Sequence, residues 1–304
     1  MKLERDPVWG PIFNKFAIGC VQHVAEMIYS MPLPLARRAG DLAGRAAAWI
    51  LKKKLRFAEE QAERALGPGG GWAGSASVRQ FGQLLPEVVH IRKTFDRERW
   101  RRLVEVRGEQ HLRDAASMGK GVVAVSAHLG NWEIGGCGIG HLGFRLSWLL
   151  RPVENPFLQD GLNEIRASAG VGVITKWGGL REAMHVLRRG EILAMLVDQD
   201  ARDQGVFVPF FGQEASTLKS PALLSLRTGA PILPFAARRR PDGRMTLDFA
   251  EPFVAEGSHE HEGDLERATA RFTACIEAWI RETPDQWLWI HRRWKTRREK
   301  PSAG

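Results

Sequence analysis

The chain has 304 residues and a mass of 34.0 kDa, and its 44 lysines and arginines against 35 aspartates and glutamates give a formal net charge of +9. Its 44% hydrophobic and 26% charged residues are ordinary for a globular protein, which excludes collagen-like, mucin-like and disordered chains. Eleven tryptophans accompany a single tyrosine. A basic, tryptophan-rich chain predicts an anionic partner, which is a nucleic acid, a phosphorylated metabolite or a membrane surface.

The most apolar stretch covers residues 16–36 and is about long enough to cross a bilayer. On a helix, however, Lys15, Gly19, Gln22, Glu26 and Ser30 form one polar stripe. We therefore expect an amphipathic helix that lies in the membrane interface or packs on the protein. Basic residues follow where anionic head groups would lie: Arg37, Arg38, Arg45, Lys52, Lys53, Lys54 and Arg56. The alternative is a buried amphipathic helix followed by a solvated basic one.

The glycine-rich residues 67–74 mark the clearest boundary along the chain. We expect an N-terminal, membrane-associating helical region over residues 1–74 and a second domain over residues 75–304. Residues 78–113 have the pattern of an arginine-rich helix.

Beyond residue 121, short runs rich in Val, Ile and Leu alternate with helical patterns. The expected strands cover residues 122–127, 146–150, 172–175, 192–197, 232–237 and 245–249, and the expected helices include 180–189, 218–228 and 265–281. This alternation predicts an α/β fold in which helices flank a central, mostly parallel sheet.

The sharpest local feature is the segment Ala-His-Leu-Gly-Asn-Trp-Glu at residues 127–133, directly after an expected strand. A glycine-containing bend allows His128, at the strand end, to meet Glu133, in the first turn of a following helix. The Glu133 carboxylate would then hold one imidazole N–H and leave the other nitrogen free as a base. Such a base can deprotonate an incoming hydroxyl without a serine or cysteine nucleophile. The alternative is an ordinary loop histidine.

Other charged residues also follow expected strands. Asp198 and Asp200 end the strand at 192–197, and open α/β sheets place their sites at the carboxyl ends of strands. If that strand neighbours the strand before His128, one of these aspartates lies close to the imidazole; the alternative is a solvated turn. Arg151 follows the strand at 146–150 and suits a phosphate or a developing oxyanion, or else a surface ion pair.

Glycines at 138, 140 and 143 match the spacing of a dinucleotide-binding loop. They do not follow a strand directly, so close helix packing is the better interpretation. Cys20, Cys137 and Cys275 are odd in number and far apart, which predicts no disulfide framework and a reducing compartment. We find no signal peptide and no metal-ligand spacing, so we expect the chain on the cytosolic side without a metal.

The C-terminal residues 284–298 interleave tryptophans at 287, 289 and 294 with arginines and lysines. Such a segment suits single-stranded nucleic acid, a phosphorylated glycolipid or an acidic carrier protein. The alternative is a segment fixed to the core by its tryptophans, with a frayed basic end.

Four blocks, in chain order, resemble the signatures of one family. They are HLGNWE at residues 128–133, RPVENP at 151–156, DQD at 198–200 with GVFVPFFG at 205–212 and Thr217, and PDQWLWIHRRWKTR at 284–297. The chain thereby resembles the bacterial lipid A biosynthesis (lauroyl and myristoyl) acyltransferases, within the lysophospholipid acyltransferase superfamily with its His-x4-Asp/Glu motif. The resemblance implies a glycerolipid-acyltransferase-like α/β fold.

The resemblance also implies an activity: transfer of a fatty acyl chain from a thioester, on acyl carrier protein or coenzyme A, to a hydroxyl of a phosphorylated glucosamine lipid. His128 would take the hydroxyl proton while Glu133, with Asp198, steers the ring. Arg151 and the backbone amides after His128 would stabilise the oxyanion. The further candidate substrate-binding residues are Asn131, Asn155, Arg166, Asp200, Thr217, Arg292 and Arg293. No cofactor or metal is implied.

Several alternatives stay open on the sequence. The acceptor can instead be a lysophospholipid, a phosphoinositide mannoside or an amino-acid lipid, because the His-x4-acid box reads only the hydroxyl. A nucleic-acid-binding protein is the alternative from another class, and a hydrolase that uses the same dyad with water is a third. We expect a monomer without nucleic acid, located peripherally or by an N-terminal anchor at the cytoplasmic face of the bacterial inner membrane.

Overall fold

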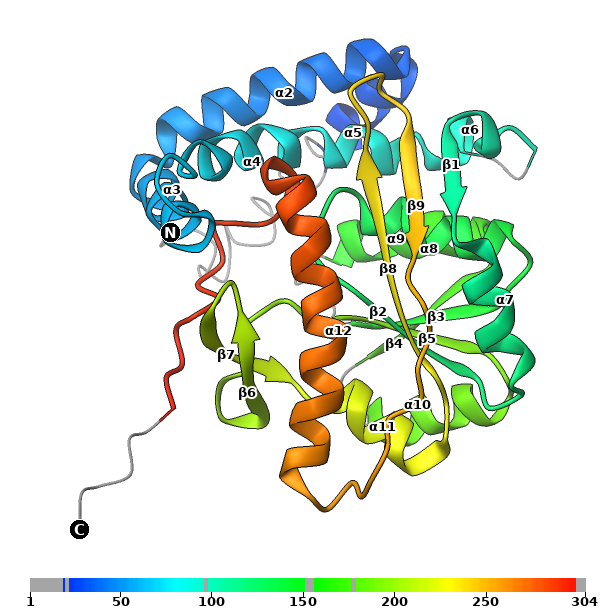
Figure 1. The fold of residues 1–304 in the computed structure, drawn as a ribbon. Coiled ribbons are helices and arrows are strands. Elements are labelled where there is room, and N and C mark those ends of the chain that lie inside the picture. The colour runs from blue at the N-terminus through cyan, green and yellow to red at the C-terminus, as the bar shows by residue number, and fades with distance from the viewer. Residues whose placement is uncertain (1–18, 20–21, 96–97, 151–155, 176–178, 299–304) are drawn as a thin grey trace, which may run out of the picture.

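The computed structural model describes residues 19, 22–95, 98–150, 156–175 and 179–298. The first part is a helical layer, in which residues 22–30 are helical and α2 to α6 follow. The bounds are α2 (Leu33–Ile50), α3 (Lys52–Leu66), α4 (Trp72–Gly82), α5 (Leu84–Val89) and α6 (Ile91–Thr94). In Figure 1, α2 runs across the top of the molecule above α4 and α5, and α3 lies at the left.

The described strands form a seven-stranded sheet in the order β1-β9-β8-β2-β5-β3-β4. The bounds are β1 (Val104–Arg107), β2 (Val122–Ser126), β3 (Leu146–Leu150), β4 (Val171–Thr175), β5 (Ile192–Leu196), β8 (Ile232–Arg239) and β9 (Met245–Phe249). Only β8 and β9 pair antiparallel within this described sheet. The expected α/β fold with a mostly parallel central sheet is confirmed. A separate antiparallel hairpin consists of β6 (Gly205–Phe210) and β7 (Gln213–Leu218).

Helices cover both faces of the sheet (Figure 1). One face packs against α7 (Glu109–Ser117), α8 (Trp132–His141) and α9 (Pro156–Ser168), and the other against α10 (Gly179–Arg188), α11 (Ser220–Thr228) and α12 (Glu262–Glu282). The first four residues of β2 are all apolar because both faces of the strand are buried. Val123 and Val125 pack in the core on one face of the sheet, and Val122 and Ala124 pack in the core on the other.

Two sequence predictions fail in the N-terminal half. Residues 78–113 are not one helix, because β1 lies between the short helices and α7. This strand is only four residues long and lies at the sheet edge, so its pattern is too short to stand out from its arginine-rich surroundings. The described part of the expected helix at 16–36 also ends at Ser30, and α2 begins after Pro32, since proline favours the first turn of a new helix.

The expected domain boundary at residue 74 falls inside α4, and the division into two domains stays a prediction. No helix in the described ranges combines the length and the apolar character that crossing a membrane requires. The membrane-associating role of the helical layer likewise stays a prediction.

The glycines at 138, 140 and 143 belong to α8 and the turn after it. Gly138 and Gly140 permit close packing, whereas Gly143 lies in open space with a positive φ of 95°. A Cβ atom at Gly140 would overlap the carbonyl oxygen of Ala169, at the end of α9. We expect Gly140→Ala to lower the free energy of unfolding by about 1–3 kcal/mol, because backbone cannot move aside as a flexible side chain can. Urea unfolding measures this.

The matched control is Gly161→Ala on α9, where no atom lies within 4 Å of the added Cβ. Alanine is the better helix former by about 1 kcal/mol, so this variant should be as stable as the parent or more stable. Equal stability of the two variants would contradict the packing interpretation of Gly140.

Candidate active site

Strands β2 and β5 are neighbours in register, with Ser126 opposite Leu196. His128 and Asp198 lie two residues beyond this pair, at the carboxyl edge of the sheet. The His128 Nδ1 atom is 2.8 Å from Asp198 Oδ1, and the His128 backbone N–H donates to Asp198 Oδ2 at 3.0 Å. The two strands are therefore neighbours, and one of the two aspartates lies close to the imidazole, as expected from the sequence for neighbouring strands.

Asp198 is buried, with 5% of its surface exposed, and it accepts a third hydrogen bond, from Trp287 Nε1 at 2.8 Å. Burial alone would raise its pKa. Attraction to His128 and the hydrogen bonds from His128 and Trp287 outweigh burial and lower the pKa to about 2. Asp198 is therefore an anion at neutral pH, and it accepts a hydrogen bond from a His128 ring that carries its proton on Nδ1.

The other face of the imidazole is accessible. The His128 side chain is 19% exposed, and its ring packs edge-on against Trp132 at a centroid distance of 4.9 Å. Among the described residues, the Nε2 atom has no hydrogen-bond partner. With Nδ1 held by Asp198, the lone pair of a neutral ring lies on Nε2, which can accept a proton from an incoming hydroxyl.

Glu133 is paired elsewhere. Its carboxylate makes a bidentate ion pair with Arg166 of α9, at 2.9 Å to Nε and 2.6 Å to Nη2, and it accepts a bond from Trp132 Nε1 at 3.2 Å. Both Glu133 and Arg166 are buried. The structure thus brings His128 together with Asp198, and Glu133 together with Arg166, which differs from the expected His128–Glu133 contact. The reason is that α8 begins at Trp132, and Glu133 in its first turn contacts α9.

Asn131 is the N-cap of α8. Its Oδ1 accepts the Ile134 N–H, its Nδ2 donates to Glu87, and it is fully buried. It therefore shapes the turn after His128, and its expected contact with substrate stays a prediction.

The backbone amides after His128 are partly occupied. The Gly130 N–H donates to Gln286 O at 3.0 Å, and the Asn131 N–H donates to Ala237 O at 2.9 Å. The next two amides, of Trp132 and Glu133, stand in the first turn of α8, where helix geometry supplies no acceptor. The Trp132 and Glu133 amides are among the backbone amides after His128 that the sequence indicates, and their role as oxyanion donors stays a prediction.

The remaining candidates are spread over the C-terminal part of the chain. Thr217 and Arg293 are buried and bond to each other, and Asp200 accepts a bond from Thr296. Arg292 is exposed and lies over the Phe57 ring. The substrate-binding roles expected for these residues stay predictions. Arg151 and Asn155 lie outside the described residues.

The C-terminal tryptophans have a structural role. Trp287 and Trp289 are 1% and 0% exposed and pack against the Phe211 ring. Sequence reasoning missed Trp287 as a donor to Asp198, although it lies in one of the four signature blocks. It also missed His291, whose pKa is lowered by burial and which lies close enough to His128 and Asp198 for their charges to act on it. The described residues contain no group of acidic, His or Cys side chains that could hold a metal ion.

Comparison with known proteins identifies the family of the chain. Residues 16–296 match the family model described as bacterial lipid A biosynthesis acyltransferase. The chain is 28% identical to a lipid A biosynthesis lauroyltransferase of Escherichia coli (strain K12) over 65% of its length, and 31% identical to a palmitoleoyltransferase of the same strain over 66%. It is 24% identical to a phosphatidylinositol mannoside acyltransferase of Mycolicibacterium smegmatis, over 88% of this chain and 95% of that protein.

The chain spans 64% of the length of each of the two Escherichia coli relatives. The family model matches most of the chain and includes the first three signature blocks and residues 284–296 of the fourth. The chain belongs to the bacterial lipid A biosynthesis acyltransferase family.

Proposed function

We propose that this protein is an acyltransferase that moves a fatty acyl chain from a thioester to a hydroxyl of a membrane glycolipid. The observation that carries the proposal is His128, which is fixed through Nδ1 by a buried, ionised Asp198 and has Nε2 open at the carboxyl edge of the sheet. A histidine held in this way is a general base for a hydroxyl nucleophile. Family membership adds the reaction class.

The reaction balances without a cofactor. His128 Nε2 takes the proton of the acceptor hydroxyl while the hydroxyl oxygen attacks the thioester carbonyl carbon and forms a C–O bond. The tetrahedral intermediate breaks its C–S bond, and the thiolate leaves with the proton from His128. Asp198 stabilises the imidazolium between these steps. A thioester is already a reactive acyl donor, so base positioning and an oxyanion site are sufficient.

The oxyanion site in this proposal is the N-terminus of α8. The Trp132 and Glu133 amides lie in the first turn of α8, at the positive end of the helix dipole, and follow His128 closely in the chain. Arg151, which follows β3, is proposed as a further donor. The Glu133–Arg166 pair acts indirectly, by fixing the first turn of α8 against α9.

Replacing the two candidate orienting carboxylates one at a time distinguishes their roles. Asp198→Asn should lower kcat about 100-fold, since an amide no longer holds the productive tautomer. Glu133→Gln should mainly lower thermal stability, because it leaves the buried Arg166 charge without its partner. Steady-state kinetics and thermal unfolding on both variants measure this. The reverse ranking of the two kcat values would return the orienting role to Glu133.

We propose a phosphorylated glucosamine lipid as the acceptor, and acyl carrier protein or coenzyme A as the donor carrier. The second candidate acceptor is a phosphoinositide mannoside. It is favoured by the length of the match to the Mycolicibacterium smegmatis relative, which spans 95% of that protein.

The decisive experiment uses purified protein in lipid vesicles with acyl thioester on either carrier, and with either acceptor. Mass spectrometry should detect an acceptor that is heavier by one acyl group. Free fatty acid as the only product would favour the hydrolase alternative. Salt-sensitive nucleic-acid binding that survives His128→Ala, without transfer, would favour the binding-protein alternative.

We further propose that the helical layer attaches the enzyme peripherally to the cytoplasmic face of the bacterial inner membrane. Leu35, Leu42 and Trp49 are 52%, 65% and 71% exposed and are spaced seven residues apart, so they form one apolar stripe along α2. Lys52 lies over the Trp49 ring, and further basic residues continue along α3. An apolar stripe beside basic residues suits an anionic bilayer surface.

Replacing Leu42 and Trp49 together with serine should therefore weaken binding to phosphatidylglycerol vesicles at least about tenfold, because two apolar side chains no longer enter the bilayer. Vesicle sedimentation measures the effect, and rising salt should weaken the parent. The control is Met118→Ser, an exposed apolar residue that follows α7 and lies away from the helical layer. Equal binding of all three proteins would exclude α2 as the attachment surface.

A further inference from the structure

The C-terminal segment, residues 286–296, contacts both halves of the proposed dyad. Against the His128 half, the Leu288 N–H donates to His128 O at 3.1 Å, and the Gly130 N–H donates to Gln286 O at 3.0 Å. Leu129 and Trp287 form an antiparallel bridge between these bonds. The turn that carries His128 is therefore paired with the C-terminal segment through one isolated antiparallel bridge.

The same segment bonds to each residue of the Asp198-Gln199-Asp200 turn. Trp287 Nε1 donates to the Asp198 carboxylate at 2.8 Å, and Arg293 Nη1 donates to the Gln199 carbonyl at 3.3 Å. Thr296 Oγ1 donates to the Asp200 carboxylate at 2.9 Å. Three consecutive residues that follow β5 are thus held by one stretch of chain about ninety residues away in sequence.

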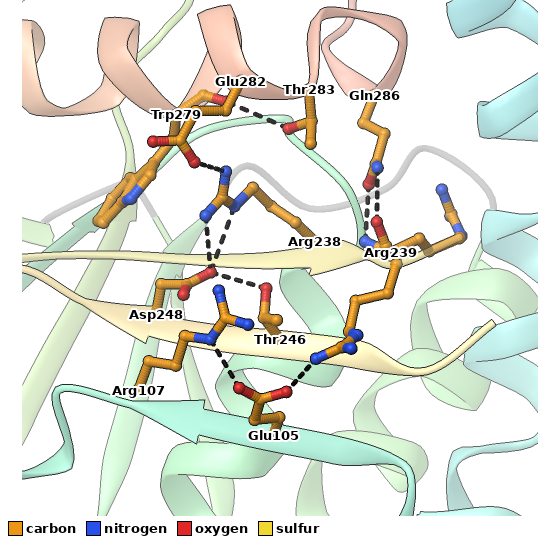
Figure 2. A network of polar contacts seen from close by, with 11 residues as sticks. Glu105, Arg107, Arg238, Arg239, Thr246, Asp248, Trp279, Glu282, Thr283 and Gln286 are labelled. Atoms are coloured by element: carbon orange, nitrogen blue, oxygen red, sulfur yellow. Dashed lines mark hydrogen bonds and ion pairs between the residues drawn. The ribbon is translucent and has the colours of Figure 1, made fainter. Parts of the chain in front are cut away.

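The start of the segment is itself anchored to the sheet. Figure 2 shows Gln286 bonded to the backbone of Arg239 in β8, with Oε1 accepting the N–H at 2.7 Å and Nε2 donating to the carbonyl at 2.8 Å. Beside it, Arg238 pairs with Asp248 and with Glu282 near the end of α12. Gln61 of α3 holds the segment from the other side, through bonds to Trp289 O and His291 O.

Arg293 is the unusual member of the segment. It is fully buried, and among the described residues its guanidinium forms no ion pair and its Nε has no partner. Its donors go instead to the carbonyls of Gln199 and Ser216 and to the Thr217 hydroxyl, and its charge lies over the Phe210 ring. Burying a charge this way is costly, and the planar, multi-donor geometry that it supplies is specific to arginine.

We propose that the C-terminal segment is the positioning element of the dyad, and that Arg293 and Thr296 fix the turn carrying Asp198 relative to His128. The inference rests on the proposed function and adds to it two positioning residues that do not touch the reacting atoms. Misplacing a catalytic group by about 1 Å can cost a hundredfold in rate, so the bonds to this turn control kcat.

Two conservative variants test the proposal. Arg293→Lys keeps the charge and loses the fork of donors, and Thr296→Val keeps the shape and loses the bond to Asp200. We expect kcat to fall about 10- to 100-fold for Arg293→Lys and several-fold for Thr296→Val, with the KM for the acyl donor nearly unchanged. We also expect the NMR resonance of the His128 Nδ1–H proton, bonded to Asp198, to shift or broaden.

The matched control is Thr228→Val at the end of α11, away from the dyad. It removes the hydrogen bond that the Thr228 hydroxyl donates to Leu224 O at 2.7 Å. It should leave kcat and the Nδ1–H resonance unchanged, whatever its melting temperature. If both test variants fold and keep the parental kcat and resonance, the proposal is overturned. A kcat that falls only together with stability, with the resonance unmoved, also overturns it.

The resonance separates this inference from the proposed function. If the parent protein transfers no acyl group but its Nδ1–H resonance moves in Arg293→Lys and Thr296→Val, the positioning role stands and the acyltransferase proposal fails. If the parent is active and neither kcat nor resonance responds in the folded variants, the acyltransferase proposal stands and the positioning role fails.

Discussion

His128→Ala should lower the rate of acyl transfer about 10³- to 10⁴-fold while the protein remains folded. The rate falls because no other group replaces the base at Nε2, and general base catalysis contributes an effect of this size. The fold is kept because Asp198 retains two of its three donors, the backbone N–H of residue 128 and Trp287 Nε1. Transfer of a radiolabelled acyl chain measures the rate, and circular dichroism follows the fold.

The matched control is His111→Ala, on α7, which contributes no residue to the proposed dyad. This variant should transfer acyl chains at the parental rate. A His128→Ala variant with a near-parental rate would remove His128 from the mechanism, whatever its effect on substrate binding.

Glu87→Ala should lower the free energy of unfolding by about 3–5 kcal/mol, the largest effect on stability that we expect from a single replacement. Glu87 is fully buried and accepts bonds from Arg239 at 2.6 and 2.9 Å, from Arg37 at 2.9 Å and from Asn131 at 2.8 Å. Removing the carboxylate leaves two arginine charges without their partner and also loosens the N-cap of α8. Urea unfolding at pH 7 measures the loss.

The pH dependence gives a second measurement of the same group. Burial would raise the Glu87 pKa, but attraction to Arg239 and Arg37 and the hydrogen bonds lower it below its ordinary value. A carboxylate whose pKa is depressed by folding stabilises the protein above its unfolded pKa, and that contribution is lost as the pH falls through the folded pKa. The parent should therefore lose stability more steeply on acidification than Glu87→Ala. The control, Glu60→Gln at the exposed pair with Arg56, should change stability little, and an equal loss in both variants would contradict the prediction.

The sheet was predictable because its strands are buried on both faces. In β2, for example, residues 122–125 are all apolar, and the helical patterns between the strands have a different period. The edge strand β1 and the hairpin β6–β7 were missed, since each is short or exposed on one side and carries polar residues. Their placement depends on partners that are remote in sequence.

The sequence was sufficient to identify the residues of the site but not to predict which of them bond to one another. His128, Asp198 and Glu133 were all identified, but which carboxylate meets the imidazole depends on β2 and β5 being adjacent and in register. Sequence spacing favoured Glu133, five residues from His128, over Asp198, seventy residues away. Trp287 was marked only as part of a signature block, and Glu87 had no local signal, because the bonds that each makes arise from long-range packing.

The position of the C-terminal segment in the chain has a consequence for synthesis. Translation delivers His128 first, then Asp198, and later the residues from 286 to 296 that bond to both. A growing chain on the ribosome therefore contains His128 and Asp198 before it contains the segment that bonds to the turns on which they lie. The site can be completed only after residue 296 has been synthesised.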